Sequence, residues 1–157
     1  MEALWDDVRT KSLDCPEQLS RRLVELLDSG FTRVDRCVFL KAQEKLRGNG
    51  KLEDFPDRTG YECFVNHIHV EDYLDQSDNV SQLVRLGQGV AFAYQMKEGL
   101  SSFSANENFR LIVSSDELSC SVRFHVIRNA EEWLSSDINS YEHEAILVLD
   151  TCASASM

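Results

Sequence analysis

The apolar residues of the chain repeat first at helical spacing. Residues 16–28 place leucines on one stripe, with Pro16 at a favourable first position and Gly30 just past the end. A longer stripe predicts a second helix over about residues 79–98, with Asp78 as its cap and Gly99 at its end. The stripe of this second helix consists of Val80, Leu83, Val84, Val90, Ala91 and Tyr94. A short helix is also expected over residues 2–9.

The pattern between residues 31 and 47 fits two structures. Val38, Phe39, Ala42 and Leu46 share one face of a helix over residues 35–47. Alternation at period two also fits a strand over residues 31–40. We prefer the helix, which the glycines at 48 and 50 would end in either case.

The later apolar segments predict strands. Residues 61–70 are rich in aromatic and β-branched side chains, after a loop over residues 51–60. Alternation at 109–114 and 119–127 predicts a hairpin with Asp116 and Glu117 at its turn. Residues 145–150 read as a last buried strand. Residues 129–135 read as a helical turn because Asn129 and Glu132 have the spacing of a capping box.

This order of elements predicts an α+β fold. We expect a mostly antiparallel sheet of four to five strands, packed against N-terminal helices and one long central helix. The 157 residues suit a single domain over 1–157. Residues 1–50 would be its helical part and residues 51–150 its sheet-bearing part, followed by a frayed tail over residues 151–157.

Charge separates the two parts further. Residues 1–50 carry nine acidic and nine basic side chains, whereas residues 51–157 carry 18 acidic and seven basic ones. The whole net charge of −11 belongs to the second part. Acidic clusters lie before the strand expected at 61–70 (Glu53, Asp54, Asp57) and in the connector after it (Glu71, Asp72, Asp75, Asp78). This balance argues against a nucleic-acid or anionic-membrane partner and favours a basic protein.

The cysteines and the N-terminus indicate a cytoplasmic protein. Five cysteines form no C-x-x-C pair, so reduced and partly buried thiols are expected. The first residues have neither a basic region nor an apolar core of a signal peptide. No apolar run approaches the roughly 18 residues of a membrane span.

Catalytic motifs are mostly missing. The chain has no phosphate-binding loop, no G-x-G-x-x-G and no G-x-S-x-G, and the H-x-E at His69 lacks the cysteine pair of a zinc deaminase. His67 and His69 would share one face of a strand at a spacing usable by two metal ligands. A small metal-dependent or metal-binding enzyme at this pair is the runner-up hypothesis. We otherwise expect no catalytic residues, no metal and no cofactor.

A binding protein is the simplest function for this profile. Trp133, beside two acids, and Tyr73 are the candidate interface anchors. The expected partner-binding residues are Glu71, Asp72, Tyr73, Asp75, Asp78, Glu131, Glu132, Trp133 and Asp137. They would occlude a basic partner one to one. A regulatory subunit of a larger assembly is a further alternative.

In size and acidity, with its acidic clusters and Glu131-Glu132-Trp133, the chain resembles the immunity proteins of bacterial polymorphic-toxin and contact-dependent inhibition systems. That resemblance implies a small α+β inhibitor that covers a cognate toxin domain or nuclease effector. The resemblance rests on size and acidity, and no motif assigns family roles to particular residues.

Overall fold

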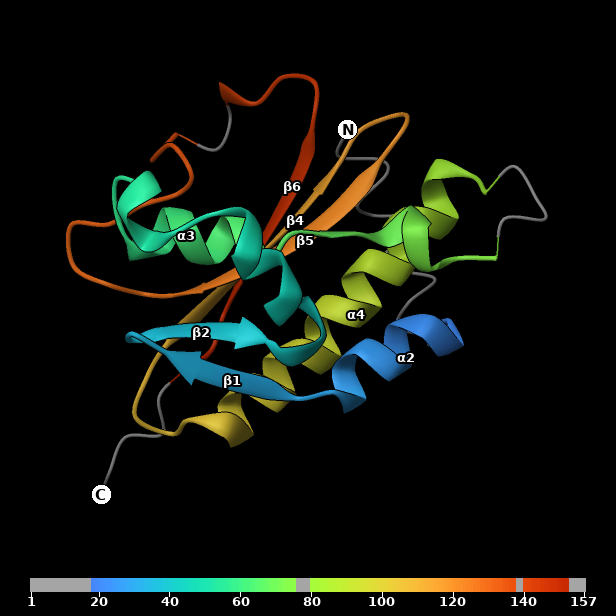
Figure 1. Ribbon diagram of the computed structural model, residues 1–157. Coiled ribbons are helices and arrows are strands. Elements are labelled where there is room, and N and C mark those ends of the chain that lie inside the picture. The colour runs from blue at the N-terminus through green and yellow to red at the C-terminus, as the bar shows by residue number, and fades with distance from the viewer. Residues whose placement is uncertain (1–17, 76–79, 138–139, 153–157) are drawn as a thin grey trace.

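The computed structural model describes residues 18–75, 80–137 and 140–152. In these residues the chain forms an α+β fold with two antiparallel sheets. Strands β1 and β2 pair in the smaller sheet, and the larger one has the order β3-β5-β4-β6. Figure 1 shows the long helix α4 crossing this four-stranded sheet, with α2 beside it. The predicted helix at 2–9 lies outside the described residues.

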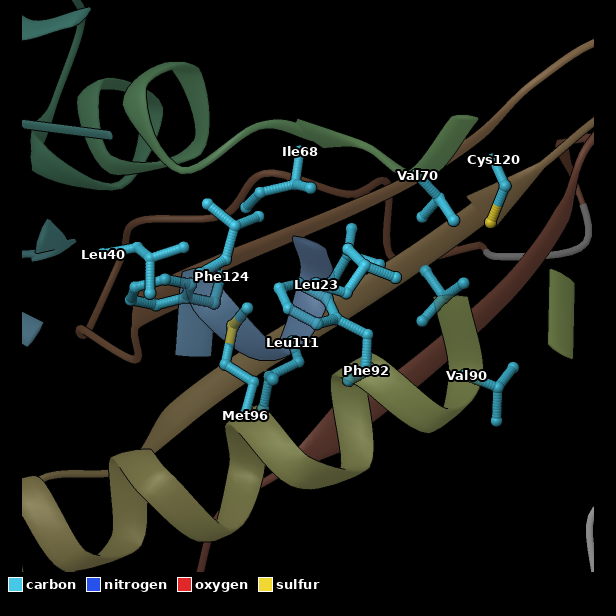
Figure 2. Close-up of a cluster of buried hydrophobic side chains, with 14 of the residues drawn as sticks. Leu23, Leu40, Ile68, Val70, Val90, Phe92, Met96, Leu111, Cys120 and Phe124 are labelled. Atoms are coloured by element: carbon cyan, nitrogen blue, oxygen red, sulfur yellow. The ribbon is translucent and has the colours of Figure 1, made fainter. Parts of the chain in front are cut away.

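The central helix α4 runs over Gln82–Phe103 and confirms the helix predicted over about residues 79–98. The predicted stripe is not its buried face, because Val84 and Tyr94 are exposed, whereas Leu86, Phe92, Ala93 and Met96 are buried against the sheet. Ser81 caps its start by accepting a hydrogen bond from the Val84 amide, in place of the expected Asp78. The helix continues past Gly99 because Leu100 is fully buried and extends the apolar face. Figure 2 shows Phe92 and Met96 of this helix meeting Leu111, Phe124 and Leu23 in the main core.

Gly89 lets α4 approach the sheet closely. A Cβ at this position would lie 2.6 Å from the Sγ of Cys120 on β5, which is closer than packed atoms can come. The close contact between α4 and β5 thus requires a residue without a side chain at position 89.

Helix α2 is shorter than predicted and spans Arg21–Asp28. Ser20 accepts from the Leu23 amide, and this cap sets the start, so the expected start at Pro16 is wrong. The leucine stripe is confirmed, because Leu23 and Leu26 are buried against α4 and the sheet. Gly30 follows the helix with a φ of 75°, which a residue without Cβ adopts freely.

The preferred helix over residues 35–47 is wrong. Residues 31–40 form a hairpin of β1 (Phe31–Val34) and β2 (Cys37–Leu40), followed by a 3-10 helix at Lys41–Asn49. Asp35 and Arg36 make the turn with φ values of 52° and 65°. Both values are positive, as in a type I′ turn, whose twist matches that of the two strands. The alternative of a strand over residues 31–40 is closer to the observed hairpin. The expectation that residues 1–50 form a helical part is wrong for this segment.

The predicted strand over residues 61–70 is also wrong. Helix α3 occupies Arg58–Val65, after a short 3-10 helix at Leu52–Asp54, and only β3 (Ile68–His69) is extended. Asp57 caps α3 by accepting from the Gly60 amide at 2.7 Å. Another 3-10 helix, Val70–Tyr73, begins the acidic connector. Strand propensity depends strongly on context, and here the Asp57 cap and tertiary hydrogen bonds stabilise a helix in its place.

Two polar side chains, one on α3 and one at its C-terminal cap, bind both sheets. Glu62 accepts from the amides of Val38 on β2 and Val126 on β5, at 2.7 and 2.9 Å. Asn66 donates to the carbonyls of Val38 and Phe124, and its side-chain oxygen accepts from Leu40. The hairpin is thus held beside β5 by side chains instead of by direct strand pairing.

The predicted C-terminal hairpin is confirmed as β4 (Phe109–Ser115) and β5 (Cys120–Val126). Strand β6 (Ala145–Asp150) pairs with β4, but it is half-buried at the sheet edge instead of fully buried. The helical turn expected at 129–135 is wrong, because Ala130 has a φ of 62° and breaks any helical path. Thr151 is buried, so the expected frayed tail is wrong at this residue, and residues 153–157 lie outside the described part of the chain. Among the described residues, no helix has the length and apolarity to cross a bilayer.

Candidate functional site

A cleft of about 460 Å³ lies between α3 and the chain that follows β5. Residues 55–67 form one wall, Arg123 of β5 contributes to it, and Glu132 and Trp133 form the other wall. The cleft has the size of a small-ligand pocket. Two residues from different predictions line this cleft, His67 as a candidate metal ligand and Trp133 as a candidate interface anchor.

The α3 wall is fixed by hydrogen bonds on the helix's opposite side. Because Glu62 and Asn66 are held by the two sheets, Cys63, Phe64 and His67 line the cleft. The Phe64 side chain is 45% exposed, and its ring centroid lies 5.1 Å from that of Phe55. An aromatic surface therefore faces solvent at the mouth of the cleft.

Glu131 holds the opposite wall in place. Its carboxylate accepts from the backbone and hydroxyl of Thr59, at 3.1 and 2.9 Å, and lies 3.8 Å from Arg128. These contacts tie the chain after β5 to the first turn of α3. Glu132 and Trp133 then project as exposed side chains, with Trp133 41% exposed.

Arg123 carries the positive charge of the cleft. Its guanidinium lies 5.2 Å from the ring centroid of Trp133, and Nη2 lies 3.3 Å from Nδ1 of His67. Its Nε is buried without a hydrogen-bond partner. Among the described residues no carboxylate lies within ion-pair distance of Arg123, in contrast to Arg110 on the neighbouring strand, which pairs with Asp150 at 2.8 Å. Burial lowers the pKa of the Arg123 guanidinium.

His67 is neutral at pH 7. Burial lowers its pKa to about 4, and the positive charges of Arg123 and His69 add to this effect. Because a guanidinium can only donate, Nδ1 accepts and the ring proton sits on Nε2. Burial also raises the pKa of the neighbouring Cys63 thiol. Cys63 and His67 are therefore a thiol and a neutral imidazole, which lack the thiolate of a cysteine nucleophile.

The two predicted metal-ligand histidines do lie together. The ring centroids of His67 and His69 are 4.1 Å apart, and His69 Nδ1 lies 3.7 Å from Glu71. Within the described part of the chain, no group of three or more histidine, cysteine, aspartate or glutamate residues is arranged to hold a metal ion. The metal-enzyme hypothesis thus gains no third ligand there.

The first set of predicted partner-binding acids lies away from the cleft. Figure 1 shows α3 at the left and the segment after β3 at the right. In that segment Glu71 accepts from the Cys120 amide at 3.1 Å and supports the sheet. Tyr73 is half-buried between Arg22 and Gln43. Asp72 and Asp75 are exposed, and Asp78 lies outside the described residues.

The second set is closer to the cleft but divided in role. Glu132 and Trp133 line it, whereas Glu131 supports its wall. Asp137 is exposed, and its carbonyl accepts from Ser140 in a local turn. Arg123 and Phe64 are not among the predicted site residues. Arg123 occupies a polar position of an alternating strand, and such a position does not reveal the lack of a carboxylate partner.

Comparison with known proteins assigns the chain to a family. The model of the uncharacterized protein PM0498 family matches residues 7–157. Uncharacterized protein PM0498 of Pasteurella multocida (strain Pm70) is 34% identical over 77 residues, which cover 45% of this chain and 47% of that protein. The chain thus spans about half the length of this curated relative. No solved structure matches the chain.

Proposed function

The chain belongs to the uncharacterized PM0498 family, and we propose that it is a non-catalytic protein that neutralises a basic protein partner by one-to-one occlusion. The observation that supports this proposal is the pairing of exposed aromatic and acidic side chains at one cleft. Phe64 and Trp133 are 45% and 41% exposed, and Asp57 and Glu132 line the same cleft.

Aromatic side chains are enriched at the centres of protein interfaces, where they are frequent anchors. The acids around them set the sign of the partner's charge. Glu53 and Asp54 are exposed just before Phe55 and add to this acidity. A basic surface would be attracted to this face, and the attraction would mainly raise the association rate.

The net charge of −11 supports the same class of partner. A nuclease or toxin domain is a natural candidate, because a protein that acts on phosphates needs a cationic surface of its own. An inhibitor that covers such a surface needs no catalytic group. We place this encounter in the cytoplasm, where the free thiols of Cys37, Cys63 and Cys120 would stay reduced.

Photo-crosslinking from the cleft tests the proposal. Benzoylphenylalanine replaces Trp133 in cells of the source organism, and in a matched control it replaces Tyr94, which is 51% exposed on α4. We expect a protein of basic isoelectric point to be captured from position 133 and not from position 94. Equal capture from both positions, capture of an acidic protein only, or no capture would contradict the proposal.

The captured protein is then purified and its binding measured. Glu132→Lys should weaken binding at least tenfold, mainly by slower association, whereas Glu98→Lys on the exposed face of α4 should leave it unchanged. One equivalent of the wild-type chain should abolish the partner's own activity. An affinity insensitive to Glu132→Lys, or a partner that stays active when bound, would refute occlusion through this cleft.

A further inference from the structure

We propose that the cleft beside α3 is also a binding site for a small organic acid, with Arg123 holding the carboxylate and the aromatic walls holding a flat apolar body. This inference goes beyond the proposed function and shares only its location. It starts from Arg123, whose charge has no carboxylate within ion-pair distance in the described part of the chain.

A partly buried guanidinium without a carboxylate is costly to keep. The contacts that Arg123 makes compensate this cost only in part. One donor reaches His67 at 3.3 Å, the ring of Trp133 lies 5.2 Å away, and Nε has no partner. The planar fork of donors on arginine suits the two oxygens of a carboxylate, which would supply the missing charge.

The surroundings of Arg123 limit the charge of the ligand. Asp57 and Glu132 line the same cleft, so a dianion such as a phosphate monoester would meet repulsion that a single carboxylate meets less. His67 is neutral and adds no second cation. One unpaired guanidinium with acids nearby thus selects a monoanion.

The walls define the rest of the ligand. Phe55, Phe64 and Trp133 contribute aromatic surface, and the volume of about 460 Å³ is within the range of small-molecule sites. A flat ring can stack between such side chains, as aromatic groups do in protein cores. The geometry therefore points to an aromatic monocarboxylate instead of an aliphatic dicarboxylate.

Calorimetry on the purified full chain tests this site without any protein partner. The probes are phenylacetate, its neutral isostere phenylacetamide, and phenyl phosphate. We expect phenylacetate to bind, the amide to bind at least tenfold more weakly, and phenyl phosphate to be weaker than the carboxylate at pH 8. Equal binding of acid and amide, no binding of phenylacetate, or tighter binding of phenyl phosphate would overturn the proposal.

Variants locate the binding. Arg123→Lys should reduce phenylacetate affinity at least tenfold, because lysine loses the planar fork. Arg110→Lys is the matched control on the same sheet face and should leave the affinity unchanged, since Arg110 already pairs with Asp150. Trp133→Ala, at an exposed position, removes a wall without threatening the fold and should weaken binding likewise. Unchanged affinity in Trp133→Ala and Arg123→Lys would exclude this cleft, whatever the outcome of the crosslinking.

Discussion

Glu62 on α3 and Asn66, which caps the end of that helix one turn later, each bind the backbone of both the hairpin strand β2 and the sheet strand β5. Arg128 completes this arrangement with two contacts to the Glu62 carboxylate, at 2.7 and 2.9 Å. Glu62 is fully buried, and its carboxylate thus has four donors. The position of α3, and with it one wall of the cleft, depends on these two residues.

Removing the Glu62 carboxylate should be strongly destabilising. Glu62→Ala leaves two buried amides without acceptors and takes from Arg128 its nearest carboxylate, so we expect a loss of about 3–5 kcal/mol in the free energy of unfolding. Urea denaturation measures it. The control Glu25→Ala removes an exposed i,i+4 pair with Arg21 and should cost under about 1 kcal/mol. A similar cost for both variants would show that α3 is held by apolar packing alone.

Gly89 gives a prediction whose sign depends on the background. Gly89→Ala in the wild type should lower stability by about 1–3 kcal/mol, because the new methyl group meets the buried Cys120 Sγ. In a Cys120→Ala background the nearest remaining atom belongs to Val70 at 3.5 Å, an ordinary contact. There the better helix propensity of alanine should prevail and stabilise by up to about 1 kcal/mol. Thermal unfolding of the four proteins checks this, and the same sign in both backgrounds would contradict it.

Stability should fall on acidification through the pKa of unfolded histidine. Burial, with Arg123 and His69 nearby, lowers the pKa of His67 from 6.5 to about 4. Between these values the unfolded chain binds a proton that the folded chain does not, so the free energy of unfolding decreases from pH 6.5 towards pH 4. Above pH 6.5 both states are neutral at this residue, and no further change is expected from it.

Urea midpoints at pH 7 and pH 5 test this dependence. We expect His67→Gln to lose less stability over this interval than the wild type. The variant should keep part of the effect, because burial also lowers the pKa of His125. His143→Gln, at an exposed position, serves as the control and should follow the wild type. Parallel losses in His67→Gln and the wild type would show that His67 does not titrate differently on folding.

The turn of the first hairpin should be improvable. Asp35 and Arg36 both have positive φ, a region that costs residues with a Cβ about 1 kcal/mol or more. Asp35→Asn with Arg36→Gly supplies the preferred type I′ pair and should stabilise by about 0.5–1 kcal/mol in urea denaturation. The carbonyl of Arg36 that accepts from Arg128 is retained. Asp35→Asn with Arg36→Ala keeps the Cβ and should gain less, and equal gains would argue against backbone strain at the turn.

Long periodic segments were the predictable part of the fold. The helical spacing in α4 and the alternation in β4 and β5 predicted these elements and the α+β class. The faces were less predictable, because β4 and β5 are buried on both faces and α4 buries residues outside the predicted stripe. Strand β2 was not predicted as the preferred structure, because it is buried on both faces and its sequence therefore lacks the alternation of apolar and polar residues. Val38 and Leu40 face the main core, whereas Cys37 and Phe39 face a second cluster with Tyr61.

Helix α3 and the cleft could not be predicted from local sequence alone, because tertiary contacts decide both. The aromatic and β-branched composition of α3 favoured a strand, although Asp57 three residues before Gly60 was a usable capping signal. Trp133 and Glu132 could be predicted as site residues from their local composition. The role of Arg123 could not, because it follows from the distances to carboxylates elsewhere in the fold.

Helix α3 forms one wall of the cleft and also holds the hairpin against β5, so ligand binding and attachment of the hairpin depend on the same helix. Any molecule that fills the cleft and restrains α3 will lower the opening frequency of amides in the hairpin, on the far side of that helix. Hydrogen exchange at Leu40 then becomes a remote gauge of occupancy. Ligand occupancy of the cleft and local stability of the hairpin are linked through the last turn of α3.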